Sequence, residues 1–189
     1  MNSFYSVDEL EKIGFKALGE NVLLSKKSSI YGAKNISIGS NVRIDDFCIL
    51  SGNIKLGSYI HIAAYCALYG GDKGITINDF ANLSSRISIY SISDDYSGNT
   101  MTNPMIPEKY KMILSDEVTI EKHVIIGSGS VVLPGIILKE GSSFGAMSLI
   151  NRSSEPWSIN VGIPSIKIKN RSKKLLELEK EFINEIHRK

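Results

Sequence analysis

The sequence predicts an all-β solenoid, a chain wound into stacked triangular coils, with a short N-terminal helix, one extended loop and a C-terminal helix. Three features of its 189 residues predict this fold. Aliphatic residues recur every six positions over most of the chain, the residue four positions later is apolar or small, and the residue that directly follows is often small or turn-prone. A helix repeats about every 3.6 residues and a strand every two, whereas a short strand followed by a tight turn accounts for a period of six.

This six-residue grid occurs in three blocks. Residues 70–74 form a glycine-rich insertion between the first two blocks, and residues 91–117 interrupt the grid before the third. Because each coil covers the apolar edge of the next, we expect the grid side chains to be buried. The ten positions for which we predict burial are Ile38, Ile44, Leu50, Leu56, Ile62, Leu83, Ile89, Ile126, Val132 and Leu138.

The two ends of the chain predict helices. Ser6 followed by Glu9 forms a capping-box pattern, which begins a short N-terminal helix. Residues 172–188 are rich in Lys and Glu, so we expect an amphipathic helix that packs on the body or on a neighbouring subunit. We therefore divide the chain into a solenoid domain, residues 1–170, and a C-terminal helix, residues 171–189. The apolar residues at helical spacing in the second helix are Leu175, Leu178, Phe182 and Ile186.

Composition and charge exclude several classes of protein. The 22 basic and 20 acidic residues give a net charge of +2, and 42% of the residues are apolar, so the chain is neither disordered by composition nor a highly basic nucleic-acid-binding protein. Cys48 and Cys66 are too few for a disulfide scaffold or a Cys-rich zinc site, and no metal-ligand spacing is present. Without an apolar run of about 18 residues or a secretion signal, we expect a soluble cytoplasmic protein with no membrane span.

Three motifs in the last third of the chain resemble those of a known family. They are IGS at 126–128 followed by VLPG at 132–135, FGAMS at 144–148, and VGIPS at 161–165. Together with the six-residue grid, over roughly residues 16–170, they are similar to the hexapeptide-repeat acyltransferases. The resemblance implies a left-handed parallel β-helix, a homotrimer, and acetyl-CoA as the acyl donor.

The interruption at residues 91–117 is a candidate functional loop, because a loop of this length within a compact solenoid is more often functional than idle. Its first part, residues 90–103, resembles acetyltransferases of bacterial O-antigen clusters, including those that act on dTDP-4-amino-4,6-dideoxyglucose. The resemblance implies a nucleotide-linked amino sugar as the acceptor, with Asp95 and Tyr96 as acceptor-binding residues.

By the same resemblance, Asp94 occupies the position at which sugar acetyltransferases carry a basic histidine, and residues 91–117 contain no histidine. A carboxylate is a weak base for a sugar hydroxyl unless its surroundings raise its pKa. A deprotonated amine attacks a thioester unaided, so a carboxylate need only orient it or accept a proton afterwards. Asp94 therefore favours N-acetylation. The alternative is that Asp94 and Asp95 merely form an Asx turn in a polar loop.

His61 is the second candidate for a base or for orienting the acceptor. It directly precedes the grid residue Ile62, so strand alternation turns its side chain away from the core, where it could line a cleft between subunits. An ordinary surface histidine is the alternative. His123 falls at an expected corner, where we predict a solvated side chain, and His187 belongs to the C-terminal tail.

The resemblance also carries five positions over to CoA binding. Ser128 would face the thiol end, where a neighbouring backbone N–H could stabilise the thioester oxyanion, and the small Ala146 would let the pantetheine arm lie against the coil. Asn151 and Arg152 would lie near the phosphates, and Lys169 near the adenosine 3′-phosphate. The alternatives are a solvated charge at Arg152 and Lys169, and a small residue required by coil packing at Ser128 and Ala146.

Three functions remain open at this point. The first is an acetyl-CoA-dependent N-acetyltransferase that modifies a nucleotide-linked amino sugar for bacterial surface polysaccharide, as in O-antigen and lipopolysaccharide synthesis. The second is a sugar O-acetyltransferase of the same fold. The third is a non-catalytic β-helix scaffold. The motifs that resemble CoA-binding segments argue against a scaffold, whereas the aspartate at the histidine position leaves this alternative open.

Overall fold

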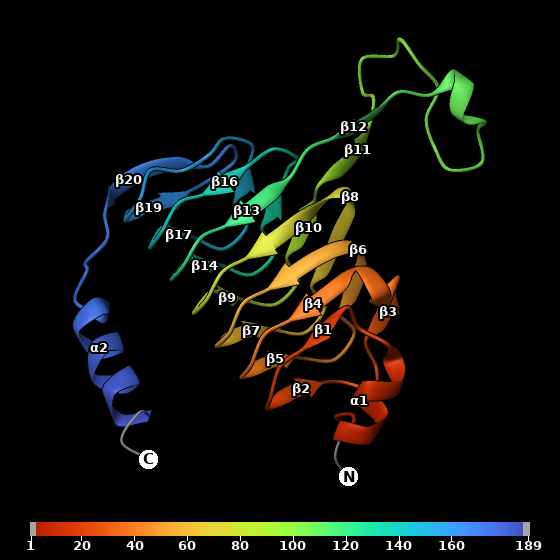
Figure 1. Cartoon of the computed structure of the whole chain (residues 1–189). Helices are drawn as coiled ribbons and strands as arrows, with labels where there is room; N and C mark the ends of the chain where they lie inside the picture. The colour runs from red at the N-terminus through yellow and green to blue at the C-terminus, as the bar shows by residue number, and fades with distance from the viewer. Residues whose placement is uncertain (1–2, 187–189) are drawn as a thin grey trace.

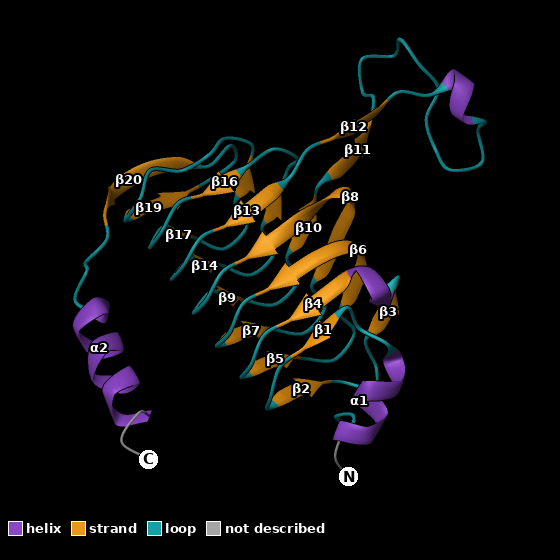
Figure 2. Ribbon diagram, viewed as in Figure 1, coloured by secondary structure: helices purple, strands orange, loops and turns teal. Residues whose placement is uncertain are grey.

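The computed structural model describes residues 3–186 and is a left-handed parallel β-helix with one helix at each end (Figure 1, Figure 2). Successive coils stack along the axis, and their short strands form three faces. Two faces belong to one ten-stranded sheet, because β6 (Ile49–Leu56) and β8 (Ala67–Ile77) continue around a corner. The third face is an eight-stranded sheet. The predicted fold class is confirmed.

The remaining strands of the two sheets are short, because each spans one side of a triangular coil, except β20, which pairs antiparallel with β19. The ten-stranded sheet also contains β1 (Ala17–Leu18), β3 (Ser29–Tyr31), β4 (Ile36–Ile38), β10 (Ser88–Tyr90), β13 (Val118–Ile120), β15 (Val131–Val132), β16 (Ile137–Leu138) and β18 (Leu149–Ile150). The eight-stranded sheet contains β2 (Val22–Leu24), β5 (Val42–Ile44), β7 (Ile60–Ile62), β9 (Asn82–Leu83), β14 (Ile125–Ile126), β17 (Ser143–Phe144), β19 (Ser158–Val161) and β20 (Ile166–Asn170). A 3₁₀ turn, η1 (Ala33–Asn35), lies between β3 and β4.

Parallel pairing between coils places the grid residues in register. Ile44 lies opposite Ile62 on the next coil, and Ile62 lies opposite Leu83 on the coil after that. The insertion at residues 70–74 is contained within β8, whose register against β6 shifts at Gly52. The insertion therefore bulges locally and leaves the grid in phase on both sides.

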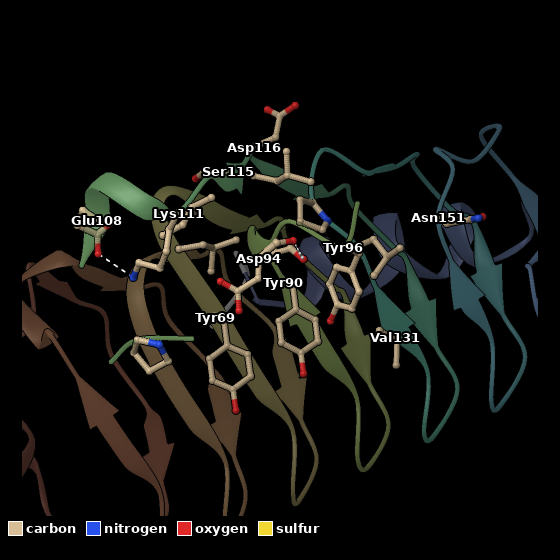
Figure 3. Close-up of a pocket in the computed structure, with 17 residues that line it drawn as sticks. Tyr69, Tyr90, Asp94, Tyr96, Glu108, Lys111, Ser115, Asp116, Val131 and Asn151 are labelled. Atoms are coloured by element: carbon tan, nitrogen blue, oxygen red, sulfur yellow. Dashed lines mark hydrogen bonds and ion pairs between the residues drawn. The ribbon is translucent and has the colours of Figure 1, made fainter. Parts of the chain in front are cut away.

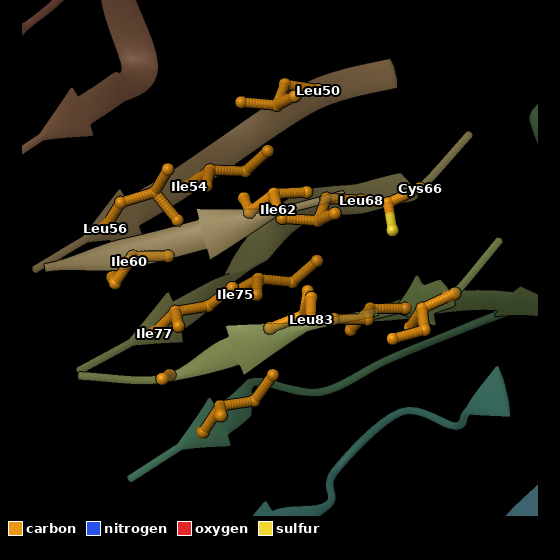
Figure 4. Close-up of a cluster of buried hydrophobic side chains, with 14 of the residues drawn as sticks. Leu50, Ile54, Leu56, Ile60, Ile62, Cys66, Leu68, Ile75, Ile77 and Leu83 are labelled. Atoms are coloured by element: carbon orange, nitrogen blue, oxygen red, sulfur yellow. The ribbon is translucent and has the colours of Figure 1, made fainter. Parts of the chain in front are cut away.

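The grid side chains fill the interior of the solenoid (Figure 4). All ten residues that we predicted to be buried are 3% exposed or less, which confirms the predicted core. Ile60 and Ile75, each two positions before a grid residue, also point inward, so a strand supplies two core side chains. Full burial of one aliphatic side chain contributes roughly 1.5–3 kcal/mol, and the stacked rows therefore hold the coils together.

Non-glycine residues with a left-handed backbone mark the corners. Phe47, Tyr59, Tyr65 and Phe80 have φ between 58° and 64°, a conformation that costs roughly 1–2 kcal/mol per residue. Because corners recur at the same place in each coil, their side chains stack: the ring centroids of Phe47 and Tyr65 are 4.9 Å apart, as are those of Tyr59 and Phe80. Aromatic pairs contribute about 0.5–1.5 kcal/mol beyond burial, which offsets part of the backbone cost.

Both predicted helices are present. α1 (Val7–Ile13) begins at the capping box, where the Ser6 N–H donates to Oε2 of Glu9 at 2.8 Å and the Glu9 N–H donates to Oγ of Ser6 at 3.3 Å. α2 (Leu175–Ile186) begins three residues after the start of the predicted span, residues 172–188. The tail from His187 to residue 189 lies outside the described residues. Neither helix, nor any other in residues 3–186, is long and apolar enough to cross a membrane.

α2 packs on one corner of the solenoid. The ring of Phe182 lies edge-on to Tyr59, with centroids 5.4 Å apart, and the carboxylate of Glu179 lies 2.8 Å from Nε2 of His123. The prediction of a solvated His123 is wrong, because α2 covers that corner and leaves the residue only 7% exposed. A contact so distant in the chain leaves no trace in the local pattern around His123.

Residues 91–117 leave the solenoid as a projecting segment, which we call the arm (Figure 1). β11 (Ile92–Asp94) and β12 (Ile113–Ser115) pair antiparallel at its base, and a 3₁₀ turn, η2 (Glu108–Tyr110), lies farther out. The arm exposes large apolar side chains, among them Tyr96 (92% exposed) and Met105 (88%). The interruption of the grid is therefore a folded element anchored by a two-stranded ribbon.

Candidate active site

A cleft of about 1510 Å³ lies where the arm leaves the solenoid (Figure 3). One wall is the outer surface of β8, β10 and β15, and the other is the base of the arm. The lining is mostly apolar and aromatic with a few charged groups, the usual composition of a small-molecule site. The lining residues used below are Tyr69, Tyr90, Asp94, Tyr96, Lys111 and Asn151.

Two tyrosines form the floor of the cleft. Tyr69 and Tyr90 are partners in the β8–β10 register, and their rings stack with centroids 5.1 Å apart. Each directly follows a buried grid residue, so strand alternation turns its side chain outward. We did not identify them from the sequence, although a tyrosine after the grid residue on two successive coils is a readable signal.

Asp94 ends β11 and lines the cleft beside Tyr90, so the structure places the predicted catalytic carboxylate in the cleft (Figure 3). Its position is set by the β11–β12 ribbon, in which Asp94 lies opposite Ile113. None of the ion pairs within residues 3–186 involves Asp94.

Asp95 and Tyr96 take different positions. Asp95 is 6% exposed, and its carboxylate accepts hydrogen bonds from the Ser97 N–H (2.8 Å), the Ser97 hydroxyl (2.9 Å) and the Thr100 hydroxyl (3.0 Å). These bonds, the one from the Ser97 backbone first, hold the pKa of Asp95 below its usual value. Asp95 therefore orders the arm, in the manner of an Asx turn, whereas Tyr96 lines the cleft.

His61 lies on β7 of the eight-stranded sheet, away from the residues that line the cleft. Nε2 of its ring lies 2.8 Å from Oδ2 of Asp45, and Nδ1 lies 3.2 Å from Oδ1 of Asn82. Burial raises the pKa of Asp45, but hydrogen bonds from His61 and Arg43 outweigh it and leave that pKa below its usual value. Both ring nitrogens of His61 are thus engaged within one chain.

Ser128 and Ala146 come together where the corner between β14 and β15 stacks on the corner between β17 and β18. The coils approach so closely there that a Cβ on Gly127 would lie 2.4 Å from the backbone nitrogen of Ala146, so only glycine fits. The carbonyl of Ser128 accepts the Met147 N–H at 2.8 Å, and its hydroxyl accepts from Ser85 at 3.3 Å. The corner thus carries small side chains, as predicted from the sequence.

The three other residues predicted to bind CoA do not lie together in the structure. Asn151 lines the cleft, and Arg152 is exposed next to it in the chain. Lys169 is exposed on β20, where it lies opposite Ile159 at the end of the eight-stranded sheet. The structure thus brings Asp94, Tyr96 and Asn151 to one cleft and leaves Lys169 apart from it. Within residues 3–186 no group of three or more His, Cys, Asp or Glu side chains could hold a metal ion.

Comparison with known proteins gives close relatives. No family model matches the chain. A dTDP-4-amino-4,6-dideoxy-D-glucose acyltransferase from Escherichia coli is 55% identical over 177 residues, which cover 92% of each chain. AntD, an N-acyltransferase from Bacillus cereus whose structure contains dTDP and 3-hydroxybutyryl-CoA, is 55% identical with a TM-score of 0.97, over 99% of this chain and all of AntD.

Two variants of AntD and one distant protein complete the comparison. The D94A variant of AntD was crystallised with dTDP and coenzyme A, and the S84A variant with dTDP-4-amino-4,6-dideoxyglucose and coenzyme A; each gives a TM-score of 0.96 over 98% of this chain and all of that chain. A hexapeptide-repeat acetyltransferase from Vibrio cholerae, VCA0836, is 20% identical with a TM-score of 0.60, over 89% of this chain and 84% of its own. The last likeness is one of fold alone.

Proposed function

Because this chain belongs to the family of the dTDP-4-amino-4,6-dideoxy-D-glucose acyltransferases, we propose that it transfers an acetyl group from acetyl-CoA to the 4-amino group of a dTDP-linked 4-amino-4,6-dideoxyglucose. It is an acyltransferase, and its acyl donor is a CoA thioester. The observation that carries the proposal is the position of Asp94 in the cleft, in a chain 55% identical to enzymes of this activity.

In the proposed reaction the neutral amine attacks the thioester carbonyl. A C–N bond forms, the C–S bond breaks, and the CoA thiolate leaves. The attacking nitrogen becomes positively charged, so it must lose a proton as the tetrahedral intermediate collapses. Asp94 would orient the amine and accept that proton, and backbone N–H groups near Ser128 would stabilise the oxyanion. The proton then passes to solvent or to the leaving thiolate.

The relatives support Asp94 and add Ser84. AntD was altered at an aspartate numbered 94 and a serine numbered 84, and this chain carries Asp94 and Ser84 at the same numbers in an alignment that spans nearly its whole length. The Ser84 N–H donates to the carbonyl of Ile126 at 3.0 Å, which places Ser84 one coil from Ser128. We therefore propose Ser84 as a further site residue, which the six-residue grid did not distinguish from other turn residues.

The two alternative functions are less well supported. Membership of an enzyme family excludes the scaffold as the main function. The close relatives include a named N-acyltransferase, and no histidine lines the cleft within residues 3–186, so an amine acceptor fits better than a hydroxyl. AntD binds 3-hydroxybutyryl-CoA. The assay therefore compares acetyl-CoA with 3-hydroxybutyryl-CoA as the acyl donor.

We also propose that the chain acts as a cytoplasmic homotrimer in the synthesis of bacterial surface polysaccharide, including O-antigen and lipopolysaccharide. The exposed apolar side chains of the arm, such as Tyr96 and Met105, support assembly, because such groups are usually covered by a partner. Acetyl-CoA and nucleotide sugars are cytoplasmic metabolites, which supports the location. Light scattering should give three times the chain mass of 20.8 kDa; a monomer mass at micromolar concentration would overturn the trimer.

The test compares two acceptors that differ in one group. CoA release is measured with dTDP-4-amino-4,6-dideoxyglucose and with the matching sugar that bears a hydroxyl at C4, each with acetyl-CoA and with 3-hydroxybutyryl-CoA. The amine should react faster, and its rate should rise with pH with a midpoint that tracks the pKa of the acceptor amine. Faster acylation of the hydroxyl sugar would overturn the proposed N-acylation and show that the enzyme is an O-acyltransferase.

A further inference from the structure

The cleft contains a buried positive charge that the proposed chemistry does not use. The side chain of Lys111 is 4% exposed, and among the described residues that line the cleft it is the only basic one. Its Nζ lies 2.9 Å from Oε1 of Glu108, whose own side chain is 80% exposed (Figure 3). The ion pair therefore joins a buried ammonium to a solvent-exposed carboxylate.

Glu108 is an incomplete partner for this ammonium. An ammonium has three N–H donors, and the well-hydrated carboxylate of Glu108 is the one acidic partner of Lys111 within residues 3–186. A buried charged donor without acceptors costs free energy. The hydroxyl of Ser115, which lines the same cleft, is also buried and has no hydrogen-bond partner in the described part of the chain. Both groups suit a ligand that brings anionic oxygens into the cleft.

The ribbon at the base of the arm fixes Lys111 relative to Asp94. Asp94 lies opposite Ile113, and the backbone at Lys111 is extended, so Lys111, Ile113 and Ser115 share one side of the segment and all line the cleft. Lys111 lies just beyond the ribbon, two residues before the partner of Asp94, and its backbone bridges to that of Met101. The cleft therefore presents the ammonium of Lys111 in addition to the carboxylate of Asp94.

We propose that Lys111 binds the diphosphate of the nucleotide sugar and so determines at which end of the cleft the nucleotide lies; the inference rests on the proposed function. In a 4-amino sugar linked through C1, the amine and the diphosphate leave opposite ends of one pyranose ring. In this arrangement Asp94 would face the amine and Lys111 would face the diphosphate, so each end of the sugar would meet a side chain of complementary charge. Lys111 would select a nucleotide-linked sugar over the free sugar.

The experiment measures binding by titration calorimetry with dTDP and with thymidine, which differ only in the diphosphate. The proteins are the wild type, Lys111→Met, Lys111→Arg and, as a matched control, Lys109→Met, whose lysine is exposed on the same arm and does not line the cleft. Lys111→Met should weaken dTDP binding about 10- to 100-fold and leave thymidine binding unchanged. Lys111→Arg should restore part of the loss, and Lys109→Met should match the wild type.

CoA affinity and the melting temperature show whether each variant is folded. If Lys111→Met does not fold, Lys111→Gln replaces it as the uncharged variant, and Lys111→Arg should keep a stronger preference for dTDP over thymidine than Lys111→Gln does. If Lys111→Met keeps the full preference for dTDP over thymidine, the role of Lys111 is wrong and the proposed function is untouched. If the wild type binds neither dTDP nor the dTDP-linked amino sugar, the proposed function fails, and the inference fails with it.

Discussion

His123 and Glu179 are joined across 56 residues of sequence: Nε2 of His123 lies 2.8 Å from Oε2 of Glu179, and the imidazole stacks on Phe80. The same carboxylate accepts a hydrogen bond from Lys122. Burial raises the pKa of Glu179, but the hydrogen bonds from Lys122 and His123 outweigh it and hold that pKa below its usual value. This contact fastens α2 to a corner of the solenoid.

Replacing Glu179 by Gln should therefore lower the free energy of unfolding by about 1–3 kcal/mol at pH 7. The folded-state pKa of Glu179 lies below the unfolded value, so its stabilisation is present above the usual pKa of 4.5 and is lost as the pH falls through the folded-state value. Urea unfolding of wild type and Glu179→Gln should show a difference that shrinks below pH 4.5. Glu181→Gln, on the exposed side of α2, is the control. A difference that stays constant with pH would contradict this account.

Asp94→Asn keeps the shape of the side chain and removes its charge. We expect kcat to fall about 100-fold or more, because proton transfer by a positioned group contributes on this scale, while the affinity for CoA stays near that of the wild type. Steady-state kinetics and calorimetry with CoA separate the two effects. Full turnover in the variant would remove Asp94 from the mechanism.

His61→Asn tests the second candidate base. Both ring nitrogens of His61 are engaged, with Asp45 and Asn82, so we expect kcat to fall less than tenfold, well short of the loss in Asp94→Asn. The comparison needs both variants in one assay with the amino sugar. A loss in His61→Asn as large as in Asp94→Asn would assign the base to His61.

Lys169→Ala tests the predicted contact with the adenosine 3′-phosphate. If the contact exists, the variant should lose roughly tenfold or more of its preference for CoA over dephospho-CoA, since a well-placed charged hydrogen bond contributes about 1.5–3 kcal/mol. Arg152→Ala should weaken the binding of both cofactors equally, because its predicted partners are phosphates that both contain. An unchanged preference in Lys169→Ala would show that Lys169 is a solvated charge.

Gly141→Ala should destabilise the last coils. Gly141 has φ of +67°, and a Cβ there would lie 2.4 Å from the ring of Trp157, which is 8% exposed. We expect a loss of about 1–3 kcal/mol in the free energy of unfolding, from overpacking added to backbone strain. Gly98→Ala is the matched control, because Gly98 has φ of +82° and nothing within 4 Å of the added Cβ. Equal losses in the two variants would mean that the Trp157 contact contributes nothing.

The candidate site was predictable to the extent that its residues interrupt the six-residue grid. Asp94 stands in the interruption and lies in the cleft. Tyr69 and Tyr90 obey the grid, so their one sequence signal is a tyrosine directly after the grid residue on two successive coils. Lys111 was missed for another reason: a lysine in a polar segment is normally solvated, and only the packing of the arm makes its side chain 4% exposed.

The solenoid, its buried rows and both helices follow from the sequence alone, because these depend on interactions that repeat at a fixed spacing. In the solenoid, an aliphatic residue every six positions meets another aliphatic residue on the next coil. The burial of His123, which α2 covers from 56 residues away, and the arrangement of charges in the cleft depend instead on how distant segments pack. Those features arise where a segment outside the six-residue repeat packs against the solenoid. The burial of a polar or charged side chain there depends on a neighbour that no local pattern encodes.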